Sequence, residues 1–259
     1  MLSIDLNCDM GEGFGPWKMG NDAELLRLVS SANIACGFHA GDPTTMRKTA
    51  ELAMKNGVAI GAHPGYPDLQ GFGRRAMTMT ADEVYDLVVY QAAALKGICE
   101  SLGTRLNHVK PHGALYNKAA RNALLAETIA RAVHDLDPDL ILYGLSGSES
   151  IKAAKAAGLP TASEVFADRT YQCDGSLTPR THQNALIDDP GVAADQAAGF
   201  VENSSVLSAD GSKVDVTADT ICIHGDGPHA LEFAKAIRAE LERRDIIIAP
   251  IDVRYDGCR

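Results

Sequence analysis

The sequence predicts a parallel α/β barrel in which polar side chains gather at one face. Seven short apolar segments each run into a group of polar residues, and a helix-like stretch follows most of them. The apolar segments are residues 3–6, 33–36, 58–60, 106–109, 140–145, 161–166 and 220–223. In a barrel of parallel strands the C-terminal strand ends meet at one face, where active sites form. The pattern therefore favours an enzyme.

The elements between these segments have recognisable helix signals. The strands themselves are largely apolar throughout, as expected when both faces of a strand are buried. Asp42 is an N-cap followed by proline at the first helical position, and Thr80 with Glu83 forms a capping box. Asp226 is expected to cap the last long helix. The expected helices are residues 21–30, 43–56, 80–101, 115–135, 147–157, 189–202 and 227–244.

Two segments interrupt this alternation of strands and helices. Residues 61–79 are rich in glycine and proline and cannot form one regular element. Residues 203–217 predict a small hairpin that turns at 209–211. Irregular inserts on a barrel usually cover or border its site. Since no linker or repeat is visible, we expect a single domain over residues 1–259.

Composition excludes several classes of function. The formal net charge of −10 and the pI near 5.2 argue against a nucleic-acid-binding surface. No apolar stretch reaches the roughly 20 residues of a membrane span, and the N-terminus lacks the pattern of a signal peptide. The six cysteines are scattered without metal-binding spacing, so we expect buried, unreactive thiols and a cytoplasmic protein.

The N-terminal segment 5–13 concentrates three carboxylates and an amide. Strand alternation points Asp5, Asn7 and Asp9 in one direction, and Glu12 follows. Carboxylates at a barrel mouth can bind a metal, act as a base or hold a substrate amine. The alternative is a solvated loop in which an acidic residue serves only as a cap. Because the position is a strand end, we favour a functional role, with Asp5 as the most structural of the set.

Four histidines follow four different strands. These residues are His39, His63, His112 and His224. A lone buried histidine is usually structural, but imidazole is also the side chain that titrates nearest neutral pH and the commonest metal ligand. Four histidines at equivalent strand ends predict that at least two belong to the site.

Two basic residues also follow strands. Lys110 ends a buried strand, where an unpaired ammonium would be costly, so it should face a carboxylate or an anionic substrate. Arg169 follows Asp168, and its planar guanidinium suits a substrate carboxylate or phosphate. An internal salt bridge between Asp168 and Arg169 explains the pair equally well.

The motifs closely resemble those of the LamB/YcsF family over residues 3–249. The matching segments are residues 5–13, 31–42, 61–68, 108–117, 164–171, 174–180 and 224–226. The resemblance implies a seven-stranded barrel similar to the glycoside hydrolase/deacetylase fold. It also implies an A subunit that acts with subunits B and C of a 5-oxoprolinase to open 5-oxoproline to L-glutamate with ATP. Residues 13–19 form a longer segment than in some members, and Cys8 stands where alanine is common.

This chemistry assigns roles to the candidate residues. ATP would be a co-substrate of the complex, with magnesium, and the lack of a P-loop motif favours phosphorylation by a partner. Opening a lactam needs a base for water, an acid for the leaving nitrogen and cations for anionic groups. The catalytic candidates are Asp9, His39, His63 and His112. The substrate-binding candidates are Asn7, Glu12, Lys110, Asp168, Arg169, His224 and Asp226.

Two other functions compete with this interpretation. In a metal-dependent deacetylase or amidohydrolase, Asp9 with two of the histidines, in the first instance His39 and His63, would bind a divalent ion that activates water. In a scaffold subunit without catalysis, the polar residues at the strand ends would be dispensable.

Overall fold

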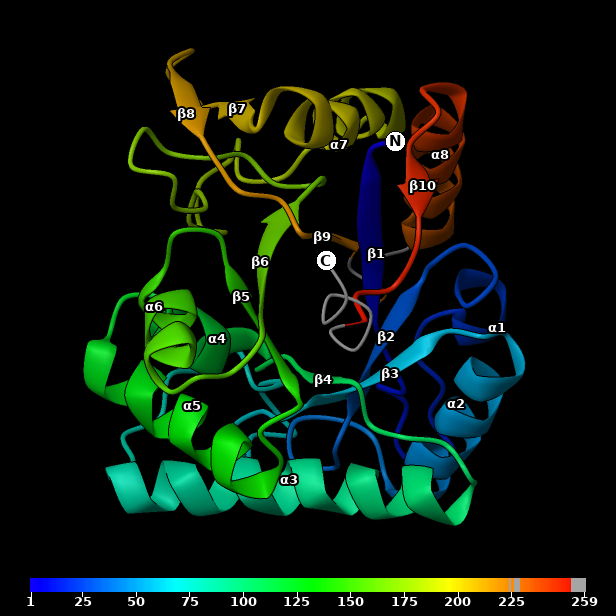
Figure 1. Ribbon diagram of the computed structural model, residues 1–259, viewed down its shortest axis with the longest axis vertical. Coiled ribbons are helices and arrows are strands. Elements are labelled where there is room, and N and C mark those ends of the chain that lie inside the picture. Colours follow the sequence, from blue (N-terminus) through cyan, green and yellow to red (C-terminus); the bar gives the residue numbers. More distant parts are fainter. Residues whose placement is uncertain (224, 226–228, 253–259) are drawn as a thin grey trace.

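The structure is a computed structural model that describes residues 1–223, 225 and 229–252 (Figure 1). Its centre is a closed barrel of seven parallel strands, which confirms the predicted fold class. The strands, in order around the barrel, are β1 (Ser3–Met10), β2 (Ser31–Ala35), β3 (Ala59–His63), β4 (His108–Val109), β5 (Ile141–Leu145), β6 (Thr161–Phe166) and β9 (Thr220–Ile223). The barrel closes because β9 pairs with both β6 and β1. The short β10 (Ile247–Ile248) pairs with the start of β1.

The first strand is longer than the sequence suggests. Predicted to end at Leu6, β1 continues to Met10 because its backbone pairs with β9 and then with β2. Asn7 and Asp9 therefore lie within the strand rather than after it. Strand alternation sends these polar side chains toward the barrel interior, while Cys8 and Met10 are buried in the hydrophobic core. Conversely, β4 has only two residues where four were expected.

Eight helices are present among the described residues. They are α1 (Asp22–Leu25), α2 (Pro43–Lys55), α3 (Ala81–Ser101), α4 (Gly113–Ala119), α5 (Ala123–Leu136), α6 (Glu149–Ala156), α7 (Pro190–Asn203) and α8 (Ala230–Arg243). The single helix predicted for residues 115–135 is divided into α4 and α5, because the side chain of Asn122 accepts a hydrogen bond from the amide of Leu125 and caps a new helix. The helix predicted for residues 21–30 shrinks to one turn, since Ser30 instead hydrogen-bonds Asp5.

The predicted helix caps are present where the structure describes them. Asp42 accepts hydrogen bonds from the amides of Thr44 and Thr45 at the start of α2. Thr80 and Glu83 form the reciprocal capping box of α3. The last helix begins at Ala230, later than predicted, and the expected cap Asp226 lies outside the described residues, as does His224.

Of the two irregular segments, the hairpin follows the prediction and the other begins later than predicted. Strands β7 (Ser205–Leu207) and β8 (Lys213–Asp215) form the expected antiparallel hairpin. The glycine- and proline-rich segment begins three residues later than predicted, because residues 61–63 complete β3, and residues 64–79, all of which are described, contain neither helix nor strand.

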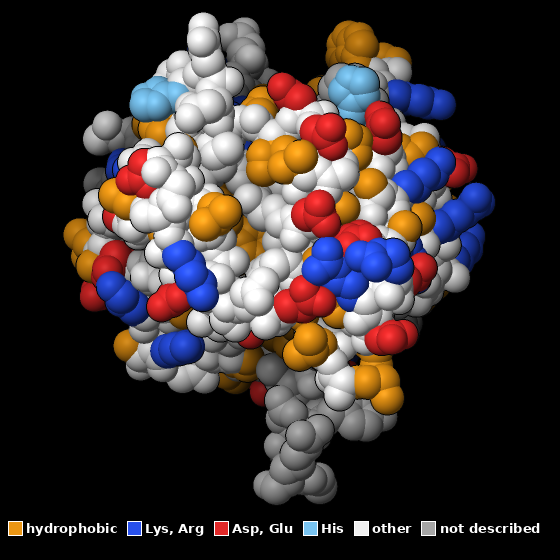
Figure 2. Space-filling model, turned by 90° about the horizontal axis from the view of Figure 1, so that it is seen from above, with side chains coloured by type: hydrophobic (Ala, Val, Ile, Leu, Met, Phe, Trp, Pro, Cys, Tyr) orange, Lys and Arg blue, Asp and Glu red, His pale blue; other side chains and the backbone are white. Residues whose placement is uncertain are grey.

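The helices surround the barrel, and α7 packs against α8 at one end of the view (Figure 1). Acidic and basic side chains are interspersed over the face seen from that end (Figure 2). Of the helices that the structure describes, none combines the length and apolar character needed to cross a membrane.

Candidate active site

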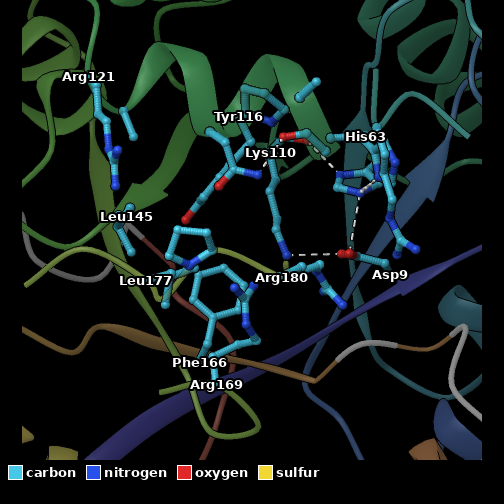
Figure 3. Close-up of a pocket in the computed structure, with 18 of the residues that line it drawn as sticks. Asp9, His63, Lys110, Tyr116, Arg121, Leu145, Phe166, Arg169, Leu177 and Arg180 are labelled. Atoms are coloured by element: carbon cyan, nitrogen blue, oxygen red, sulfur yellow. Dashed lines mark hydrogen bonds and ion pairs between the residues drawn. The ribbon is translucent and has the colours of Figure 1, made fainter. Parts of the chain in front are cut away.

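A cavity of about 390 Å³ lies at the C-terminal ends of the barrel strands (Figure 3). Asp9 of β1, His63 of β3 and Lys110, directly after β4, line it on one side, and Leu145 of β5 and Phe166 of β6 on the other. Side chains from five different strands or strand ends thus converge on one space. This is the face at which the sequence predicted chemistry.

Lys110 lies in the cavity wall between two carboxylates. Its Nζ is 2.9 Å from Oδ1 of Asp9 and 2.8 Å from Oε1 of Glu164. Asn7 Oδ1 and Cys222 Sγ, both at 3.1 Å, complete its surroundings. Burial by itself would lower the pKa of Lys110, but the negative charges of its neighbours, Asp9 first, outweigh burial and raise the pKa well above its usual value. Lys110 is therefore a permanent cation.

Burial disfavours the thiolate form of two cysteines near this lysine. Burial raises the pKa of Cys222 well above its usual value and does the same for Cys8. Both thiols are therefore protonated at neutral pH. This agrees with the expectation that the core cysteines are unreactive.

The tautomers of His63 and His112 are fixed by backbone carbonyl groups. His63 Nδ1 lies 2.7 Å from the carbonyl oxygen of Lys110, and His112 Nε2 lies 2.8 Å from that of Phe72. A carbonyl oxygen only accepts, so each of these nitrogens carries a hydrogen. The other nitrogens, His63 Nε2 and His112 Nδ1, face one another at 2.9 Å. His63 Nε2 is also 3.4 Å from Oδ2 of Asp9.

A third imidazole and a carboxylate complete this group. The ring of His39 stacks on that of His112 with centroids 3.7 Å apart. Glu12 Oε1 lies 3.8 Å from His39 Nε2 and 3.9 Å from His112 Nδ1. Burial, reinforced by the neighbouring histidines, lowers the pKa of His39 well below its usual value and that of His112 to about 3. Both rings are therefore neutral at physiological pH.

Two glycines make the histidine stack possible. A Cβ at Gly65 would lie 2.6 Å from His39 Nδ1, and a Cβ at Gly73 would lie 2.8 Å from His112 Cδ2. The glycine-rich segment after β3 therefore serves the site by letting the backbone approach the imidazole rings closely.

A hydrogen-bond network under the cavity holds Asp9 in place. The Nδ2 group of Asn33 donates to Asp9 Oδ1 at 2.8 Å and to Asn7 Oδ1 at 2.7 Å. His108 donates from Nε2 to Oδ1 of Asn33 at 2.8 Å. Asn7 in turn donates to Glu164 at 3.0 Å. Sequence reasoning overlooked Asn33, although its place on β2 opposite Asp9 of β1 follows from the strand register.

Arg169 is buried in the loop that follows β6. Its guanidinium donates to the carbonyl oxygens of Thr178 and Ala185 and so holds the loop over the cavity. Burial, and then the charge of Arg180, lowers the pKa of Arg169 to about 10. The arginine remains charged, and two guanidinium groups influence each other at the cavity wall.

The cavity is strongly cationic among the described residues that line it. The basic residues are Arg74, Lys110, Arg121, Arg169 and Arg180, whereas Asp9 is the one acidic residue. The chain as a whole carries a net charge of −10, so this concentration of positive charge is local. Arg74, Arg121 and Arg180 were not predicted. They come from loops and from a helix end rather than from strand ends.

The structure brings together most of the predicted site residues. Five of them line the cavity: Asp9, His63, Lys110, His112 and Arg169. Asn7, Glu12 and His39 lie behind this wall in direct contact with it. Asp168 is partly exposed beside Arg169 and is not among the lining residues. His224 and Asp226 lie outside the described residues.

Residues 4–255 match the LamB/YcsF family. The A subunit of 5-oxoprolinase from Bordetella parapertussis is 60% identical over 246 residues, which cover 95% of this chain and 98% of that protein. These two likenesses span nearly the whole barrel and all the segments that form the cavity.

Two solved structures resemble the chain to different degrees. The lactam utilization protein of Thermus thermophilus superimposes with a TM-score of 0.93 and 45% identity, covering 96% of this chain and 100% of that chain. A T48 deacetylase superimposes with a TM-score of 0.53 and 14% identity, covering 100% of this chain and 92% of that chain. The second likeness extends to the fold alone.

Proposed function

Because the chain belongs to the LamB/YcsF family, we propose that it is the A subunit of an ATP-dependent 5-oxoprolinase. In this function the side chains that line the cavity hydrolyse the lactam ring of 5-oxo-L-proline to give L-glutamate. Subunits B and C are the partners, and ATP with magnesium is the co-substrate. A five-membered lactam is an unactivated amide, so coupling to ATP supplies the driving force. Overall, the lactam, ATP and two water molecules give L-glutamate, ADP and inorganic phosphate.

The observation that carries this proposal is the charge of the cavity. Among the described residues, four arginines line it together with Lys110, whose charge is already paired with Asp9 and Glu164. 5-Oxoproline carries a single carboxylate, so this surplus of positive charge suits a more highly charged form, such as the lactam phosphorylated on its oxygen. Because the sequence has no P-loop motif, we assign the phosphorylation to a partner subunit.

Asp9 is the group best placed to act on water. Lys110 and Asn33 hold its Oδ1, while its Oδ2 faces His63 at 3.4 Å. In the proposed step Asp9 takes a proton as water attacks the carbonyl carbon of the activated lactam. The C–N bond then breaks, and the ring nitrogen takes up the proton that Asp9 received, which leaves γ-glutamyl phosphate. The second water molecule hydrolyses this acyl phosphate to L-glutamate and inorganic phosphate. The arginines hold the phosphate and carboxylate groups during this step.

Reconstitution with the two partners tests the proposal. The chain is purified alone and with subunits B and C, and L-glutamate is measured with 5-oxoproline, with and without ATP and magnesium. We expect glutamate only when all three subunits and ATP are present. Robust hydrolysis of 5-oxoproline by the isolated chain without ATP would overturn the proposal.

A metal-dependent amidohydrolase is the second candidate, and the clustered histidines of the site favour it. Such an enzyme would hydrolyse an amide without ATP and would lose this activity with a chelator. The ATP-free arm of the same experiment, repeated with zinc and with EDTA, separates the two functions.

A further inference from the structure

We propose that Glu12, His39, His63 and His112 form a binding site for a transition-metal ion, with zinc as the best match. One ligand atom from each residue lies within 4.8 Å of the others, and all four residues are buried. The site differs from the set expected from the sequence, in which Asp9 joined His39 and His63. The carboxylate grouped with the three histidines is that of Glu12, while Asp9 accepts hydrogen bonds from Lys110 and Asn33 on Oδ1 and keeps Oδ2 3.4 Å from His63 Nε2.

The orientation of two imidazoles points to a cation between them. The carbonyl oxygens of Lys110 and Phe72 place the hydrogens of His63 and His112 on the nitrogens that face away from the cluster. The lone pairs of His63 Nε2 and His112 Nδ1 then oppose each other at 2.9 Å. Two lone pairs at this distance repel unless a proton or a metal ion lies close to both. Backbone carbonyls that fix the tautomer in this way are the usual partners of metal-binding histidines.

The third imidazole favours a metal ion over a shared proton. His39 is 1% exposed, and neither of its ring nitrogens has a hydrogen-bond partner among the described residues. Burying a polar group without a partner is unfavourable, so a ligand bound to this ring from outside the protein would remove that cost. A proton between His63 and His112 would leave His39 unsatisfied. A metal ion would satisfy all three imidazoles once the ring of His39, which lies parallel to that of His112 at a centroid distance of 3.7 Å, turns so that both rings point a lone pair at the ion.

The set of donors selects the type of ion. Three imidazole nitrogens and one carboxylate suit zinc and neighbouring transition metals, whereas magnesium and calcium prefer oxygen ligands. In a tetrahedral zinc site, ligand atoms about 2.0–2.2 Å from the ion lie roughly 3.3–3.6 Å from one another, so ligand atoms that are up to 4.8 Å apart would have to close by about 1.2–1.5 Å.

The position of the cluster connects it to the cavity. His63 and His112 also line the cavity, whereas Glu12 and His39 lie behind them. A bound ion would supply Lewis acidity at the cavity wall. The metal site rests on the geometry of these four residues alone and stands whether or not the chain is a 5-oxoprolinase subunit.

Direct metal binding tests this inference without an assay of activity. The full chain is purified without chelators, and its metal content is measured by mass spectrometry. It is then stripped with dipicolinate and titrated with zinc by calorimetry, and with cobalt by visible absorption. We expect one zinc ion per chain, a rise in melting temperature with zinc, and cobalt bands typical of nitrogen and oxygen ligands.

Matched variants locate the site. Glu12→Gln and His39→Gln keep the side-chain bulk near that of the native residue and should each weaken zinc binding on the order of 100-fold. His134→Gln, which changes an exposed histidine of α5, should bind zinc like the native chain. Circular dichroism confirms that each variant is folded, and the isosteric Glu12→Gln decides the matter if His39→Gln fails to fold. Absence of zinc binding by the native chain, or equal affinity in Glu12→Gln and the native chain, would overturn the inference.

Discussion

The ammonium group of Lys110 lies 2.9 Å from Oδ1 of Asp9, and the lysine side chain is 3% exposed. Glu164 of β6, which is fully buried, contacts the same ammonium at 2.8 Å. The lysine therefore bridges two carboxylates inside the barrel. Its position is set by these ion pairs, so it serves both the stability of the barrel and the orientation of Asp9.

Replacing this lysine should destabilise the protein. Lys110→Met keeps the length of the side chain but leaves the carboxylates of Asp9 and Glu164 without their cation. Breaking a buried ion pair on one side costs about 3–5 kcal/mol, and the melting temperature should fall accordingly. Lys118→Met on the exposed face of α4 is the control and should melt like the native protein. An unchanged melting temperature in Lys110→Met would show that the lysine is not held by these ion pairs.

Arg121 should contribute to substrate binding and little to stability. It is exposed and lines the cavity from the end of α4. Losing one charge-assisted hydrogen bond should raise KM about 10- to 100-fold in Arg121→Met, measured with the reconstituted complex. Arg131→Met, an exposed arginine of α5 away from the cavity, should leave KM unchanged. A native KM in Arg121→Met would remove this residue from the binding site.

Gly65 should resist even the smallest substitution. In Gly65→Ala the new Cβ would meet His39 Nδ1 at 2.6 Å, and the backbone cannot retreat because Gln91 hydrogen-bonds both its N–H and its C=O groups. We expect a loss of about 1–3 kcal/mol in unfolding free energy. Gly97→Ala in α3, where a Cβ meets nothing within 4 Å, should instead stabilise by roughly 0.5–1 kcal/mol. Equal melting temperatures in the two variants would contradict the packing described for His39.

The cap of α2 predicts a specific dependence on acid. The hydrogen bond from the Thr45 side chain, with help from backbone amides, lowers the pKa of Asp42 to about 2 from an unfolded value near 3.8. A lowered pKa means that the stabilisation is complete above the unfolded value and is lost as pH falls toward 2. The difference in unfolding free energy between the native chain and Asp42→Ala, about 1 kcal/mol at pH 6, should therefore shrink between pH 4 and pH 2. Asparagine at this position caps the helix but does not titrate, so the difference in unfolding free energy between Asp42→Asn and Asp42→Ala should stay constant between pH 4 and pH 2. If the stabilisation by Asp42 and that by asparagine in the Asp42→Asn variant declined in parallel, the assignment would be refuted.

Sequence patterns predicted those parts of the fold that depend on local interactions. The helix caps at Asp42 and Thr80 and the seven barrel strands were confirmed, because capping residues and apolar segments act within a few positions along the chain. The length of β1 was underestimated, since its end depends on pairing with β2 and β9 rather than on its own residues. The break between α4 and α5 was missed because a single residue, Asn122, decides it.

In the candidate site, too, some features could be predicted from the sequence and others depend on tertiary contacts. The strand ends predicted that Asp9, His63 and Lys110 would converge, because parallel strands bring their ends to one face. The partner of each side chain was not predictable in this way. Glu12 meets His39 only after the chain bends, and the barrel register is what brings Asn33 to Asp9. The role of Arg121 in the cavity was not predicted, because the residues around it have the pattern of an ordinary exposed helix.

The most direct test of the account is the rate of glutamate formation by a complex that contains Asp9→Asn. Asparagine keeps the shape of Asp9 and removes its ability to take a proton. With subunits B and C, ATP and magnesium, we expect the rate to fall on the order of 100- to 10,000-fold while the complex still assembles on size-exclusion chromatography. A rate within twofold of the native complex would contradict the account and would mean that this chain only supports the chemistry of its partners.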